Sequence, residues 1–174
     1  MASRFADKPQ YVFHPIRAVR RAMYRYTAQR GGTRVARLPW GLPLEVNMSD
    51  QVGFSIAVGR VFDPCVTETL HRLIDPGDVV ADVGANVGYM TSLASVQAGR
   101  QGKVLAFEPH PRVFADLSRN VARWRENGGV GNVELRQLAL SDEPGEGTLV
   151  SGPSFEANMG LAALSSEEPA SAGS

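Results

Sequence analysis

The chain has 174 residues, of which 43% are hydrophobic and 21% are charged, and its formal net charge is zero. These totals predict a globular protein with one well-formed core and give no reason to expect nucleic acid or another polyanion as a partner. The single cysteine, Cys65, excludes an internal disulfide and a multi-cysteine metal site.

Residues 1–62 predict a small N-terminal unit of one helix and short strands. Residues 14–30 predict a basic helix, because apolar side chains recur near one face. Three short strand-like runs follow, and they predict a small β layer at the entrance to the main domain. These runs are Thr33–Leu38, Leu42–Met48 and Gln51–Val58.

Residues 63–164 predict an α/β domain with a parallel sheet flanked by helices. Helices are predicted at Pro64–Ile74, Val87–Ala98 and Pro111–Asn127, and strands at Asp78–Val83, Lys103–Phe107 and Asn132–Leu140. Strands alternating with helices of this length form βαβ units. The continuous apolar character of the strands predicts a sheet covered on both faces. The small and acidic residues 165–174 predict a disordered tail.

The most informative stretch runs from Asp82 to Gly88, where a predicted strand ends and a helix begins. Gly84 and Gly88 allow a tight turn and a close approach to a ligand, with Ala85 and Asn86 between them. Ligands of open α/β sheets bind at the carboxyl ends of the strands. We therefore expect Asp82 to order this loop and to reach an amino group of a ligand.

A second acid, Glu108, ends the next predicted strand, 20 positions after Gly88. An acid at this spacing accepts hydrogen bonds from ribose hydroxyls, so the pair of features suits an adenosine-type cofactor. A dinucleotide fingerprint needs glycines at positions 1, 3 and 6, where this chain has Gly84, Asn86 and Tyr89. That mismatch disfavours NAD, and the absence of a Gly-Lys-Ser/Thr sequence excludes a P-loop. S-adenosylmethionine (SAM) has no phosphate and is the favoured cofactor.

Three segments together resemble the FkbM family of SAM-dependent methyltransferases: residues 82–89, residues 106–111 and residues 138–142. The resemblance implies a Rossmann-like class I methyltransferase fold and O-methylation of a small molecule, sugar or glycolipid. By resemblance, the loop would line the methionine end of SAM, Glu108 would hold the ribose, and Ser141 with Asp142 would lie near the adenine. The loop positions are Asp82, Gly84, Ala85, Asn86 and Gly88. The resemblance assigns no catalytic base.

The sequence departs from the family in one respect, because no fourth core strand with an Asp-x-Glu-Gly-like segment follows residue 164. We therefore expect a sheet truncated after its third core strand, with an open edge on Asp78–Val83 that a partner chain could cover. The alternative function is a non-catalytic remnant or one piece of a split methyltransferase.

Two further sequence features bear on partners and location. No His, Asp and Glu set has metal-ligand spacing, so we expect no metal site. No apolar run approaches the roughly 20 residues of a membrane span, and the N-terminus lacks the apolar core of a secretory signal. We therefore expect no integral membrane contact and a cytoplasmic protein.

Overall fold

A computed structural model describes residues 31–126, 128, 130–145, 147–150 and 163–165. The predicted helix over residues 14–30 lies outside these residues, as does the predicted tail apart from Ser165. Ser165 ends strand β7 (Ala163–Ser165), which pairs antiparallel with β6 (Thr148–Val150).

The N-terminal unit consists of a β-hairpin and a helix. Strands β1 (Thr33–Arg37) and β2 (Pro43–Asn47) lie within the first two predicted strand runs, and they pair antiparallel. The predicted third strand is wrong, because Gln51–Gly59 forms helix α3. The Asp50 carboxylate accepts a hydrogen bond from the N–H of Gly53 at 2.7 Å and caps this helix. Capping and the burial of Ile56 therefore prevail over the strand preference of the β-branched residues.

The main unit alternates helices and strands in the predicted order. Its elements are α4 (Pro64–Leu73), β3 (Val79–Val83), α5 (Tyr89–Ala98), β4 (Lys103–Phe107), α6 (Pro111–Glu126) and β5 (Asn132–Arg136). The three strands form a parallel sheet in the order β3-β4-β5, with Asp82 level with Ala106 and Leu135. This arrangement confirms the predicted α/β, Rossmann-like fold class.

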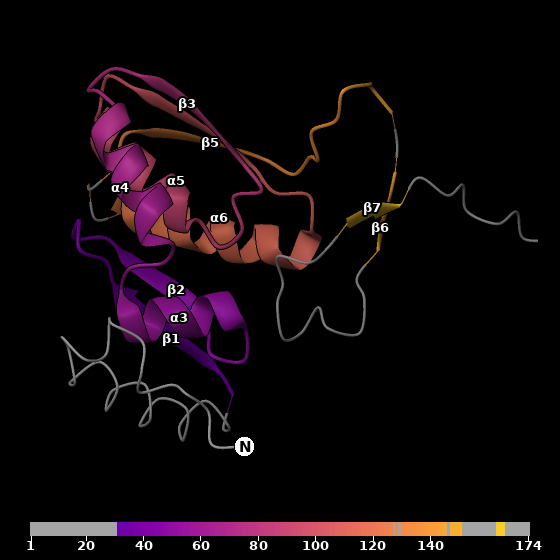
Figure 1. The fold of residues 1–174 in the computed structure, drawn as a ribbon, viewed down its shortest axis with the longest axis horizontal. Coiled ribbons are helices and arrows are strands. Elements are labelled where there is room, and N and C mark those ends of the chain that lie inside the picture. The colour runs from indigo at the N-terminus through magenta and orange to yellow at the C-terminus, as the bar shows by residue number, and fades with distance from the viewer. Residues whose placement is uncertain (1–30, 127, 129, 146, 151–162, 166–174) are drawn as a thin grey trace, which may run out of the picture.

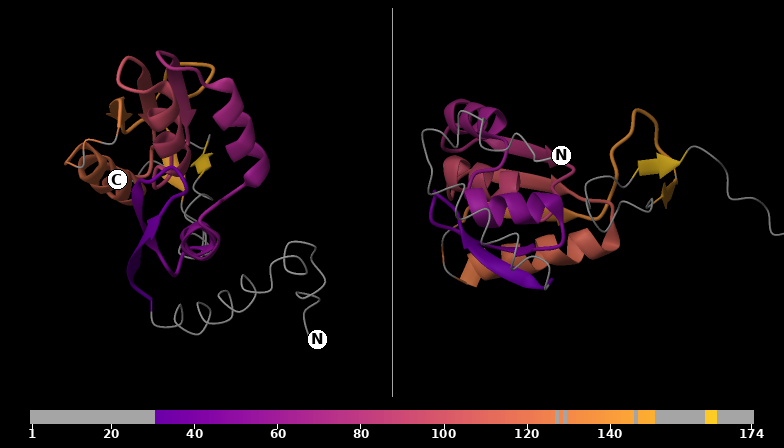
Figure 2. Two further views of the ribbon diagram at one scale, coloured as in Figure 1. Left: turned by 90° about the vertical axis from the view of Figure 1, so that its left-hand side faces the viewer. Right: turned by 60° about the horizontal axis from the view of Figure 1, so that its bottom comes forward.

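The helices lie on one face of the sheet, and β1, β2 and α3 lie beyond them (Figure 1 and Figure 2). The chain moves in one direction across the sheet, and crossovers of the same hand in that order place their helices, α5 and α6, on the same face. The prediction of a sheet covered on both faces is wrong for the described residues. Val79 and Val83 on the other face are 70% and 60% exposed. Within the described chain β3 pairs only with β4, which leaves its other edge open.

Helix α6 carries the centre of the core. Four of its side chains share one face and are fully buried, as predicted from their spacing. They are Val113, Leu117, Val121 and Trp124. One continuous cluster of buried residues joins this face to Leu44 of β2, Ile56 of α3 and Ala106 of β4. The hairpin and the sheet therefore share the core that supports the strand ends.

Candidate functional site

The loop after β3 folds over the end of β4. The N–H groups of Gly84 and Ala85 both donate to the carbonyl oxygen of Phe107 at 2.9 Å. The backbone adopts positive φ at three loop positions: 76° at Gly84, 50° at Asn86 and 96° at Gly88. Glycine adopts these angles without strain, and asparagine tolerates them better than most residues. The predicted glycine positions are therefore the ones at which the backbone turns.

Gly88 is also required by packing. A Cβ atom at this position would lie 2.7 Å from Leu117 Cδ1 and 2.9 Å from Trp124 Cη2, both fully buried on α6. A Cβ atom at Gly84 would meet nothing within 4 Å. The loop thus rests directly on α6 at Gly88, whereas Gly84 leaves open space beside the strand end.

Glu108 faces the loop from the end of β4. Its Oε2 atom accepts from the N–H of Asn86 at 3.0 Å, and its Oε1 atom accepts from the N–H of His110 at 2.9 Å. The residue is 7% exposed. Each carboxylate oxygen has a second acceptor position, so Glu108 can still accept hydrogen bonds from a ligand.

Asp82 is half-buried near the end of β3. The hydroxyl of Thr91 on α5 donates to its Oδ2 atom at 2.5 Å. Burial raises the pKa of Asp82, and the hydrogen bonds from the Thr91 side chain and backbone oppose part of that rise. Asp82 is therefore a fixed carboxylate beside the loop.

Ser141 and Asp142 lie in a neighbouring cavity of about 700 Å³ beyond the end of β5. Both are exposed, and the Ser141 hydroxyl donates to Asp142 Oδ1 at 3.0 Å. Leu138 and Leu140 add apolar surface to the cavity, and Pro109 connects it to Glu108. The structure thus brings Asp82, the loop and Glu108 together and places Ser141 and Asp142 one strand away.

Two residues of this site were missed by the sequence analysis. Thr91 lies in the first turn of α5, a position that a βα unit brings against the preceding strand end. Asn120 of α6 contacts the loop. The sequence feature that could have revealed it is the presence of a polar residue within the apolar face of the predicted helix. Asn120 lies three positions after Leu117 and four before Trp124, so helical spacing places it on the buried face.

Among the described residues, no three His, Cys, Asp or Glu side chains are grouped so as to hold a metal ion. None of the helices in the described ranges has the length and apolar character needed to cross a membrane.

Comparisons with known proteins identify the family. The family model described as the methyltransferase FkbM domain matches residues 82–173. The chain is 42% identical to the 31-O-demethyl-FK506 methyltransferase FkbM of Streptomyces tacrolimicus over 85 residues, covering 44% of this chain and 30% of that protein. It is 37% identical to the methyltransferase sdnD of Sordaria araneosa over 82 residues, covering 47% of this chain and 30% of that protein. The chain therefore spans 30% of the length of each of these relatives.

Solved structures give weaker likenesses. A structure described as P. horikoshii TYW2 in complex with MeSAdo aligns with a TM-score of 0.47 at 20% identity, covering 66% of this chain and 39% of that one. A SAM-dependent O-methyltransferase from Thermotoga maritima aligns with a TM-score of 0.39 at 21% identity, covering 45% and 29%. Because the family model matches more than half of the 174 residues, the chain belongs to the methyltransferase FkbM domain family.

Proposed function

We propose that the chain binds SAM at the loop from Asp82 to Gly88 and acts in O-methylation of a small molecule, sugar or glycolipid. Membership of the FkbM domain family supports the reaction class. The hydrogen bonding of the loop supports the choice of cofactor, and this observation carries the proposal.

All five backbone N–H groups from Gly84 to Gly88 already donate within the protein. Their acceptors are the carbonyl oxygens of Phe107 and Ala85 and the side-chain oxygens of Glu108 and Asn86. A pyrophosphate site needs free N–H groups at this position, because those groups bind the phosphate oxygens. The loop has none to offer among these five, so it does not suit a dinucleotide or a nucleoside triphosphate.

The charges around the loop lead to the same choice. Asp82 and Glu108 place two carboxylates at the ends of neighbouring strands. A dinucleotide site also has an acid at the position of Glu108, but Asp82 adds a second carboxylate beside the loop, where it would repel a phosphate group. The same two carboxylates suit a ligand with a cationic amine, a cationic sulfur and two neighbouring hydroxyls. SAM carries all of these groups and no phosphate, so the residues present fit it.

The roles of the residues follow from their chemistry. Glu108 would accept hydrogen bonds from the ribose hydroxyls, and Asp82 would stabilise the amino group of the methionine part. Ser141 and Asp142, with the apolar side chains of their cavity, would take the adenine. When bound, SAM supplies a methyl group already activated by its positive sulfur. The protein therefore contributes mainly binding, orientation and exclusion of water.

Calorimetry with S-adenosylhomocysteine (SAH), the demethylated form of SAM, tests the proposal. We expect saturable binding of SAH and no binding of NAD at the same concentration. Hydrogen bonds to a charged group contribute about 1.5–3 kcal/mol, so Glu108→Gln should weaken SAH binding about 10- to 150-fold.

A matched control separates the site from the rest of the sheet. Glu134 of β5 is a carboxylate that pairs with Lys103 at 2.7 Å and does not contact the loop. We expect Glu134→Gln to leave the Kd for SAH within about twofold. Absence of SAH binding by the folded chain, or equal losses in both variants, would contradict the proposal.

A further inference from the structure

One buried amide joins the N-terminal hairpin to the loop after β3. Asn120 of α6 is fully buried. Its Oδ1 atom accepts from the N–H of Glu45 at 2.8 Å, and its Nδ2 atom donates to the Glu45 carbonyl oxygen at 3.0 Å. The same Nδ2 atom donates to the carbonyl oxygen of Val87 at 3.0 Å. A single side chain therefore connects β2, α6 and the loop.

Asn120 uses its Oδ1 atom as an acceptor and its Nδ2 atom as a donor to two carbonyl oxygens. Only an amide side chain supplies this combination. Aspartate has the same shape but no N–H group, so it would present an oxygen to the carbonyls of Glu45 and Val87. Leucine has a similar volume but leaves all three backbone groups without a partner. Burial makes either change consequential, because water does not reach the vacated positions.

Asn120 and Glu108 contact adjacent residues of the loop. Glu108 holds the loop at the N–H of Asn86, and Asn120 holds it at the carbonyl of the next residue, Val87. One turn further along α6, Trp124 lies beneath Gly88, and its Nε1–H donates to the Pro43 carbonyl of β2 at 2.5 Å. The loop is thus held between the end of β4 and the hairpin.

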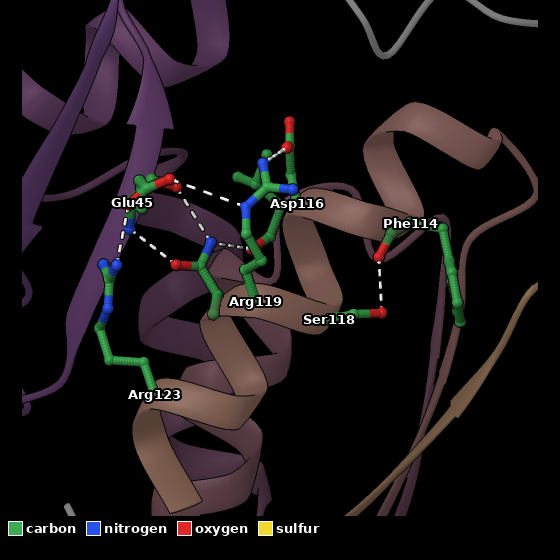
Figure 3. Close-up of polar contacts among 8 residues, drawn as sticks. Glu45, Phe114, Asp116, Ser118, Arg119 and Arg123 are labelled. Carbon is green, nitrogen blue, oxygen red and sulfur yellow. Dashed lines mark hydrogen bonds and ion pairs between the residues drawn. The ribbon is translucent and has the colours of Figure 1, made fainter. Parts of the chain in front are cut away.

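The hairpin also contacts α6 through contacts that do not reach the loop. The Glu45 carboxylate lies 2.8 Å from Arg123 and 3.8 Å from Arg119, both on α6. Figure 3 shows Glu45 of the hairpin opposite these two arginines. Strand β2 and helix α6 are therefore joined in two ways. The hydrogen bonds of Asn120 include the loop, and the ion pairs of the Glu45 carboxylate do not.

We propose that Asn120 is a positioning residue for the cofactor loop and that, through it, the hairpin sets the loop geometry on which ligand affinity depends. This inference rests on the proposed function of the loop. It assigns the segment before residue 62 a role in cofactor binding, although the family model begins only at residue 82.

The test compares Asn120→Asp and Asn120→Leu with Glu45→Gln. Glu45→Gln weakens the ion pairs to α6 but keeps the backbone groups that Asn120 binds, so it is the matched control. SAH affinity is measured by calorimetry at a temperature at which every variant is fully folded. Amide hydrogen exchange of residues 86–88 is measured by NMR without ligand, so that loop order is followed independently of binding.

We expect both Asn120 variants to bind SAH about tenfold more weakly than the unmodified chain, in line with residues that act without contacting a ligand. Exchange at residues 86–88 should rise about tenfold in the same variants. Glu45→Gln should leave both quantities within about twofold, even if its melting temperature falls. This pattern supports the inference.

Three results would overturn it. The first is unchanged exchange and affinity in the Asn120 variants. The second is an equal effect in Glu45→Gln, and the third is failure of both Asn120 variants to fold, which makes Asn120 a residue of general stability. If the unmodified chain binds no SAH, the proposed function fails, and the exchange measurement still decides whether Asn120 orders the loop.

Discussion

Replacing Gly88 by alanine should destabilise the fold by about 2–5 kcal/mol. The backbone at Gly88 has φ of 96°, and a residue with a Cβ atom pays about 1–2 kcal/mol in the left-handed region. The new Cβ atom would lie within 3 Å of Leu117 and Trp124, whose side chains are fully buried and closely packed. Overpacking of this kind adds about 1–3 kcal/mol.

Gly84→Ala is the control for the backbone part of this effect. Its φ is 76°, but nothing lies within 4 Å of the new Cβ atom, so only about 1–2 kcal/mol of backbone strain should appear. Urea denaturation gives the free energy of unfolding of each variant. The difference between the two values is the part of the Gly88→Ala effect that comes from packing against α6. Equal free energies of unfolding for the two variants would refute the close contact between the loop and this helix.

Two further predictions concern the Asp82 carboxylate and the open edge of β3. The raised pKa of Asp82 means that the folded chain holds this proton more tightly than the unfolded chain, so stability from this group is lost as the pH rises from about 3.8 through the raised pKa. Urea denaturation from pH 4 to 7 should show that loss in the unmodified chain and a smaller one in Asp82→Asn; parallel curves would count against it. Val79→Lys places a charge on the exposed face of the edge strand β3, where Val79 is 70% exposed. The open edge predicts self-association of the unmodified chain, and sedimentation velocity should show less of it in this variant, with the free energy of unfolding changed by less than about 0.5 kcal/mol. A monomeric unmodified chain, or unchanged association in the variant, would exclude this edge as a contact.

The elements that the sequence predicted correctly are those with a strong local signal. The helix over α6 follows from four apolar residues at helical spacing, and β4 has the predicted bounds because its apolar run lies between clear turn signals. The turn at Gly84 and Gly88 follows from residue type alone. These features need no knowledge of what lies across the fold.

The errors concern features that depend on distant parts of the chain. Helix α3 reads as a strand from its valine and phenylalanine residues, and only the Asp50 cap and the packing of Ile56 decide for a helix. In the described part of the chain, one face of the sheet has no helix on it because the crossovers run in the same direction, and the order of elements alone leaves that direction open. Asn120 gains its meaning from Glu45, 75 positions away, so its contact with the loop required the structure.

An NMR titration of the ¹⁵N-labelled chain with SAH tests most directly where the ligand binds. We expect saturable amide shifts at residues 82–88, at Glu108 and at Ser141 and Asp142, with little change in the outlying cavity of about 370 Å³ lined by Trp40 and His71. Shifts confined to that second cavity, or no saturable shifts in a spectrum that shows a folded chain, would contradict the account.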